Sequence, residues 1–163
     1  MIIKRPLAIA AALTLSASAA HAQYRVELVV PNGKVAIAEF HPCAGAEGPD
    51  CGAWVDRTIV SPGTGLMLAT RAISPNKHDS VTVEGGRLRI KALDGRTPQV
   101  MFLKMGTGVA RGIIISRDSR YVFVVLENAT GNPTDVMMVD LVTQNGIAGL
   151  VLDTPVLGIG MGR

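Results

Sequence analysis

Residue types that carry out chemistry are scarce in this sequence. The 163 residues include two cysteines, three histidines and one tryptophan, and aromatic residues make up 4% of the chain. Only His41 and His78 lie beyond the first 22 residues. No serine has the G-x-S-x-G spacing of a nucleophile elbow, and no local pair of carboxylates suits acid–base catalysis. We therefore predict that the protein is not an enzyme and binds no cofactor.

Helical periodicity and clustered basic residues are also missing. No segment after residue 22 repeats its apolar residues every 3.6 positions, so we expect little helix. The formal charge of +3 falls to +1 if Lys4 and Arg5 are removed with a signal peptide. We find no basic patch and no accompanying series of aromatic residues, and we therefore expect no binding to nucleic acid.

The first residues have the pattern of a Sec-type signal peptide. Lys4 and Arg5 precede an apolar core at Leu7–Leu15, and Ala20-His21-Ala22 matches an A-x-A cleavage signal. The apolar run is shorter than the roughly 20 residues that span a bilayer. We predict a signal peptide at 1–22, cleaved after Ala22, and a single all-β domain at 23–163. The protein is then periplasmic or secreted, with no membrane span after cleavage.

Runs rich in β-branched and aromatic residues alternate with polar turns, most clearly over Gly112–Thr143. This alternation is typical of an antiparallel meander. Asn-Gly at 32–33 predicts a hairpin over Tyr24–Phe40. We expect a further strand at Leu66–Ile73, and an edge strand or terminal clamp within Gly146–Arg163, where Pro155 disfavours a central strand.

One stretch resembles a known family. Ser116-Arg-Asp-Ser-Arg-Tyr-Val-Phe-Val-Val, followed by Asp135-Val-Met-Met-Val-Asp-Leu-Val-Thr, resembles one blade of YVTN-type bacterial β-propeller repeats, whose turn reads S-P-D-G-[KR]-Y. The resemblance implies that Asp118 and Asp140 stabilise turns by accepting backbone N–H bonds. Ser61–Thr70 aligns with Ser116–Val125 as a second, weaker copy.

The number of blades limits the fold. The 141 residues after Ala22 allow about three blades of the usual length, whereas closed propellers have four or more. The predicted fold class is thus all-β, an antiparallel meander forming a β-sandwich or barrel, or about three propeller-blade-like sheets.

The two cysteines bracket a loop rich in glycine and proline. In an oxidising compartment, Cys43 and Cys51 are most simply joined by a disulfide. The alternative is a copper or zinc site formed by these thiolates with His41 and His78.

We therefore expect an exported, non-enzymatic binding or interaction protein whose partner is another protein or a small ligand; an oligomer is possible. Two candidate binding surfaces follow: the cysteine loop with Trp54, and the loop Glu127–Thr134, which contains Glu127, Asn128 and Asn132. Two alternatives are open. One is an inhibitor of an exported hydrolase that resembles lysozyme inhibitors, and the other is a metal-handling protein.

Overall fold

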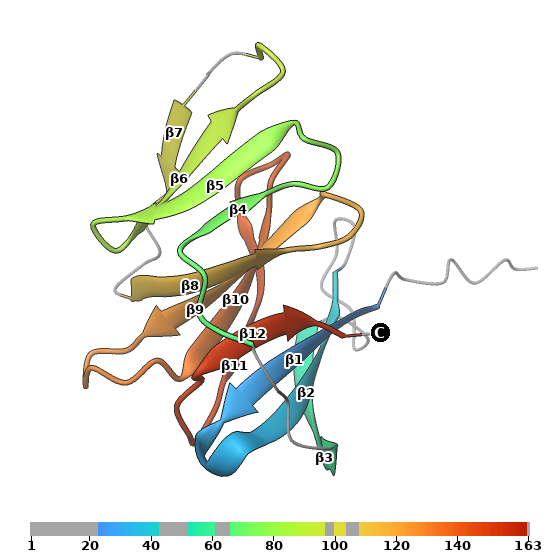
Figure 1. The fold of residues 1–163 in the computed structure, drawn as a ribbon, viewed down its shortest axis with the longest axis vertical. Helices are drawn as coiled ribbons and strands as arrows, with labels where there is room; N and C mark the ends of the chain where they lie inside the picture. The colour runs from blue at the N-terminus through green and yellow to red at the C-terminus, as the bar shows by residue number, and fades with distance from the viewer. Residues whose placement is uncertain (1–22, 43–51, 61–65, 97–99, 104–107, 163) are drawn as a thin grey trace, which may run out of the picture.

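The computed structural model describes residues 23–42, 52–60, 66–96, 100–103 and 108–162 (Figure 1). This part of the chain has no α-helix, only a three-residue 3-10 turn at Pro31–Gly33, and so offers nothing helical that could span a membrane. The strands are β1 (Tyr24–Val30), β2 (Lys34–His41), β3 (Gly52–Val60), β4 (Arg71–Ile73), β5 (Asp79–Glu84), β6 (Arg87–Ala92), β7 (Val100–Leu103), β8 (Val109–Ile115), β9 (Tyr121–Glu127), β10 (Asp135–Asp140), β11 (Gly146–Val151) and β12 (Gly158–Met161).

These strands form three separate four-stranded sheets. Sheet A has the order β12-β1-β2-β3, sheet B the order β4-β5-β6-β7, and sheet C the order β8-β9-β10-β11. Every pairing is antiparallel, and none of the three described sheets closes into a barrel. The predicted all-β fold, an antiparallel meander, is therefore confirmed, in the form of three sheets.

The hairpin predicted at Tyr24–Phe40 is present. β1 and β2 pair in continuous register, with Tyr24 opposite Phe40 and Val30 opposite Lys34. Between them Asn32 and Gly33 have φ values of 70° and 66°. Asn and Gly adopt this left-handed conformation at the lowest cost, which is why the Asn-Gly pair places the turn here.

Sheet C lies between the other two sheets, and both of its faces are covered (Figure 1). In β9 six consecutive residues, Tyr121–Leu126, are buried. Alternate side chains of a strand point to opposite faces. Phe123 and Val125 accordingly pack against sheet A, whereas Val124 and Leu126 pack against sheet B. The continuous apolar run of β9 thus reflects a strand buried on both sides.

Sheet A is completed by the end of the chain. β12 pairs with β1, with Met161 opposite Val26 and Gly158 opposite Val29. The tail predicted to supply an edge strand or a clamp supplies both, because β11 is the edge strand of sheet C and β12 clamps the first strand.

The strand expected at Leu66–Ile73 is shorter than predicted. Only Arg71–Ile73 pairs as β4. The preceding residues 66–70, the crossing segment, run along the edge strand β8 instead: the N–H of Ile113 donates to the carbonyl of Ala69 at 2.8 Å, and Leu68 packs closely over Gly112. An apolar run here signals burial against β8 rather than a place in a sheet.

Candidate binding surfaces

Two turns at one end of the sheets have the same pattern of internal hydrogen bonds. In the β8–β9 turn, the Ser116 hydroxyl donates to Asp118 Oδ1 at 2.5 Å and accepts the N–H of Tyr121 at 2.9 Å. Asp118 Oδ1 also accepts the N–H of Arg120 at 3.2 Å. Side chains of Ser and Asp commonly organise turns in this way. The turn role predicted for Asp118 is therefore confirmed.

The β4–β5 turn repeats this pattern. Ser74 Oγ donates to Asn76 Oδ1 at 2.7 Å and accepts the N–H of Asp79 at 2.9 Å, and Asn76 Oδ1 accepts the N–H of His78 at 3.0 Å. The fourth residue of each turn, Lys77 or Ser119, has a positive φ, of 62° and 64° respectively.

The same turn pattern therefore begins at Ser74 and at Ser116. The predicted alignment of Ser61–Thr70 with Ser116–Val125 fails in its second half, because residues 66–70 form no strand whereas Tyr121–Val125 lies in β9. Ser61 itself lies outside the described residues. The two turns also touch each other, because the N–H of Asn76 donates to Ser119 Oγ at 2.9 Å.

Asp140 organises the β10–β11 turn at the same end. Its Oδ1 accepts the N–H groups of Val142 and Thr143 at 2.7 and 3.2 Å, and Arg120 contributes an ion pair at 3.3 Å. Asp140 is only 1% exposed, so these bonds offset the cost of burying its charge. The predicted structural role of Asp140 is confirmed.

Tyr24 connects sheet A to this turn end. Its hydroxyl donates to Asp118 Oδ2 at 2.5 Å, and its ring lies edge-to-face on Tyr121 with centroids 5.0 Å apart. Burial and the hydrogen bond to Asp118 raise the pKa of Tyr24 well above its usual value. Burial alone would raise the pKa of Asp118, but hydrogen bonds from Ser116, Tyr24 and the backbone hold it below its usual range.

We expect Tyr24→Phe to lower the free energy of unfolding by about 1 kcal/mol at neutral pH. A tyrosine whose folded pKa is raised stabilises the fold below its unfolded pKa of about 10, and this contribution is lost as pH rises further. The difference between wild type and Tyr24→Phe should therefore shrink above about pH 10. Urea unfolding of both proteins at pH 7 and at pH 11 measures this difference in the free energy of unfolding. An equal difference at both pH values would show that the Tyr24–Asp118 hydrogen bond does not stabilise the fold.

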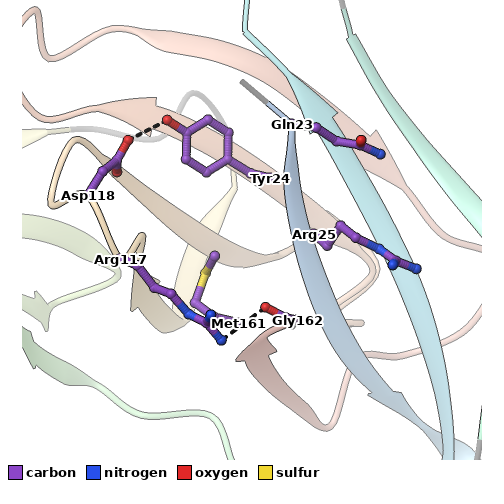
Figure 2. A pocket seen from close by; sticks show the side chains of 7 residues that line it. All are labelled: Gln23, Tyr24, Arg25, Arg117, Asp118, Met161 and Gly162. Carbon is purple, nitrogen blue, oxygen red and sulfur yellow. Dashed lines mark hydrogen bonds between the residues drawn. The ribbon is translucent and has the colours of Figure 1, made fainter. Parts of the chain in front are cut away.

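A pocket of about 400 Å3 opens beside Tyr24, where the first and last described strands meet. Its lining residues are Gln23, Tyr24, Arg25, Arg117, Asp118, Met161 and Gly162. Figure 2 shows Tyr24 pointing to Asp118 and Arg117 pointing to the carbonyl of Gly162, to which its guanidinium donates at 3.2 Å. Arg117 and Asp118, the two turn residues that line the pocket, are thus already engaged in holding the turn to sheet A.

Trp54 lies on the face of sheet A that points away from sheet C. Its neighbours Ala53 and Val55 pack inward against the core between the sheets, so Trp54 points outward, and 45% of it is exposed. Trp54 is in register with Glu39, which is in register with Arg25. The Arg25–Glu39 ion pair measures 3.5 Å, and the His41 ring stands edge-on to the indole at 4.9 Å.

The loop between β9 and β10 is held by one side chain. Asn128 Oδ1 accepts the N–H groups of Thr130 and Asn132 at 2.9 and 3.2 Å, while Asn128 Nδ2 donates to Thr134 Oγ1 at 3.0 Å. Glu127 is paired with Arg111. Asn128 is thus a structural residue, and Asn132 is exposed at the loop tip.

The two predicted surfaces lie at opposite ends of the sheets. β1 and β9 both run from the turn end, where Tyr24 and Tyr121 lie, towards the end that carries the β9–β10 loop. Trp54 pairs with Glu39, near the turn end. The structure therefore does not combine Trp54 with Glu127, Asn128 and Asn132 into one site.

The residues of the predicted disulfide and of the alternative metal site are only partly described. Cys43 and Cys51 lie outside the described residues. His41 faces Glu39 at 3.9 Å, and His78 faces Asp94 in sheet B at 3.7 Å. Within the described part of the chain no three histidine, acidic or cysteine side chains group as metal ligands. The disulfide and the metal site both stay predictions.

No protein-family model matches this chain, and no curated protein matches it. The resemblance to YVTN-type repeats therefore stays a prediction.

Sequence reasoning missed the contributions of Tyr24 and Arg25. A signal for Tyr24 existed, because Tyr24 opens its strand as Tyr121 opens β9. Arg25 offered no such signal, since its position beside Glu39 depends on the register of the hairpin.

Proposed function

We propose that this is an exported, non-enzymatic binding protein that captures a protein partner through the outer face of sheet A around Trp54. The observation that carries the proposal is a half-exposed tryptophan on a sheet face whose opposite side is firmly packed. A large aromatic side chain that is exposed to water does not gain the free energy of burial, and a partner that covers it would supply this gain.

The neighbours of Trp54 favour a protein partner. Tryptophan and arginine are enriched among the residues that dominate binding energy in protein interfaces. Here Trp54 and Arg25 lie on either side of Glu39, and the hairpin that carries Arg25 and Glu39 belongs to a sheet packed against sheet C. A rigid frame lowers the ordering cost of binding.

The test is photo-crosslinking from position 54 in the native periplasm, with position 142 as a control. Val142 is also exposed but lies at the β10–β11 turn. We expect one protein to be crosslinked from position 54 and not from 142. Purified, it should bind the wild type at least tenfold more tightly than Trp54→Ala. Equal crosslinking from both positions, or equal affinity for Trp54→Ala, would exclude this surface.

Inhibition of an exported hydrolase is the second candidate, and the β9–β10 loop favours it. Inhibitors gain affinity from loops that are ordered before binding, and Asn128 orders this loop internally. Inhibition of lysozyme by the wild type that is lost in Asn128→Ala, while Trp54→Ala retains it, would support this candidate over the first. Lysozyme activity that stays unchanged as the protein is added would exclude this candidate.

The disulfide proposal is supported by the strand pairing. The β2–β3 ladder reaches the pair His41–Gly52. Cys43 comes two residues after His41 and Cys51 directly precedes Gly52, so both cysteines flank residues that lie side by side. We expect Cys43→Ser to lower the free energy of unfolding by about 2–3 kcal/mol without reductant. With reductant, it should match wild type. Stoichiometric zinc or copper on two free thiols would instead favour metal handling.

A further inference from the structure

The outer face of sheet B, which points away from sheet C, is basic. On β6 the side chains of Leu88 and Ile90 pack against sheet C. Since side chains alternate along a strand, Arg87, Arg89 and Lys91 project from the opposite face. The expectation that the chain has no basic patch is wrong for this face.

A fourth basic residue and one acidic residue complete this face. Arg71 on β4 is in register with Thr82 on β5, which is in register with Arg89. Glu84 is the acid, and it lies 3.5 Å from Arg89 and accepts the hydroxyl of Thr82 at 3.2 Å. Four bases and one acid give the face a formal charge of +3.

This face carries a net positive charge that the rest of the chain after residue 22 lacks. The full chain has 16 basic and 13 acidic residues. Lys4 and Arg5 belong to the predicted signal peptide, so 14 basic and 13 acidic residues remain after cleavage. Outside this face the cleaved chain then has ten basic and twelve acidic residues, and its net positive charge comes from this one surface. A protein with such an uneven distribution is oriented by an anionic surface before it makes contact.

Two exposed aliphatic residues lie near the turn end of sheet B, Ile73 on the outer face beside the inward Ala72, and Leu93 directly after β6. Ile73 is 52% exposed and Leu93 46% exposed. Ile73 belongs to the row that continues through Ser80 and Lys91 to Val100. The nearby carboxylate of Asp94 is bound by Arg96 at 2.7 Å and adds little repulsion.

We propose that the outer face of sheet B docks onto a membrane surface that contains anionic phospholipids. Basic side chains attract lipid phosphates, and aliphatic side chains beside them can enter the boundary between headgroups and acyl chains. A soluble polyanion would use the bases but would gain nothing from Ile73 and Leu93. The combination of charge and exposed aliphatic area on one sheet face therefore favours a lipid surface.

The test is co-sedimentation of the purified protein with vesicles of phosphatidylcholine, or of equimolar phosphatidylcholine and phosphatidylglycerol. We expect binding to the anionic vesicles to exceed binding to the neutral ones at least tenfold, and to weaken as salt is added. Lys91→Glu should lower binding about tenfold, and Ile73→Ser should lower it at low and high salt alike.

Lys34→Glu is the matched control, because Lys34 is also an exposed strand lysine but lies on sheet A. It should change vesicle binding less than twofold, and Trp54→Ala should leave it unchanged, which separates this proposal from the proposed function. Equal losses for Lys91→Glu and Lys34→Glu, or equal binding to neutral vesicles, would overturn the proposal. Binding to heparin or DNA but not to vesicles would also overturn it, in favour of a soluble polyanion.

Discussion

Gly158→Ala is expected to destabilise the protein by several kcal/mol. A Cβ atom at this position would lie 2.3 Å from the carbonyl oxygen of Leu66 and 2.8 Å from its carbonyl carbon. Both are backbone atoms, so no side-chain rotation can relieve the overlap. Overpacking alone costs roughly 1–3 kcal/mol, and here β12 must also separate from β1 or from the crossing segment. Urea unfolding measures the loss.

Gly149→Ala is the matched control. Gly149 lies on the edge strand β11, and a Cβ there meets nothing within 4 Å. The change should stay within about 0.5 kcal/mol of wild type. If Gly158→Ala were as stable as Gly149→Ala, β12 would not pack against the crossing segment, and the closure of sheet A by the end of the chain would be wrong.

Phe123→Ala is expected to cost about 3–5 kcal/mol. Phe123 is fully buried on β9, an inner strand of the middle sheet, with its ring centroid 5.0 Å from that of Phe40 and 6.2 Å from that of Tyr24. Its removal leaves a cavity between sheets A and C that neighbouring side chains on rigid strands cannot fill. Because Phe40 and Tyr24 belong to the hairpin of sheet A, the loss should loosen that sheet first.

Val142→Ala is the control for Phe123→Ala, since Val142 is 72% exposed and should cost less than about 0.5 kcal/mol. Thermal unfolding measures the loss of stability in each variant, and native-state hydrogen exchange of the backbone amides shows which strands are affected. Exchange in Phe123→Ala should rise first in β1 and β2. A uniform rise over all three sheets, or no loss of stability, would contradict the placement of sheet C between sheets A and B.

The all-β class and the first hairpin could be predicted because their signals are local. Asn32 and Gly33 set the turn, and the alternation of strands and turns set the meander. The pairing of β12 with β1 could not be predicted, because it joins residues at opposite ends of the chain. Only the interruption of the tail by Pro155 and its glycines pointed to an edge or a clamp.

The turn pattern shared by Ser74 and Ser116 was missed in the sequence for a chemical reason. Ser61-Pro-Gly carries the letters of a propeller turn, whereas the turns that match use a serine, an Asx residue two positions later and a fourth residue with positive φ. That fourth residue is Lys77 or Ser119, not glycine, so matching letters missed it. Hydrogen-bonding capacity is the better guide to such turns.

The candidate surfaces were predicted unevenly. A lone tryptophan beside a loop was a usable signal, and Trp54 is indeed exposed. The basic face of sheet B was overlooked, although Arg87-Leu-Arg-Ile-Lys alternates as a strand should. Its extent depends on Arg71, which joins only through the pairing of β4 with β5, and such lateral neighbours are invisible in a linear sequence.

We propose that the protein is exported and binds a partner through Trp54. Native and denaturing mass spectrometry of the wild type and of Trp54→Ala, isolated from the native periplasm without reductant, tests it most directly. We expect a chain that begins at Gln23, is lighter than the full-thiol form by two hydrogens, and is held in a complex that Trp54→Ala loses. A chain that retains residues 1–22, or a complex that is identical in both proteins, would contradict it.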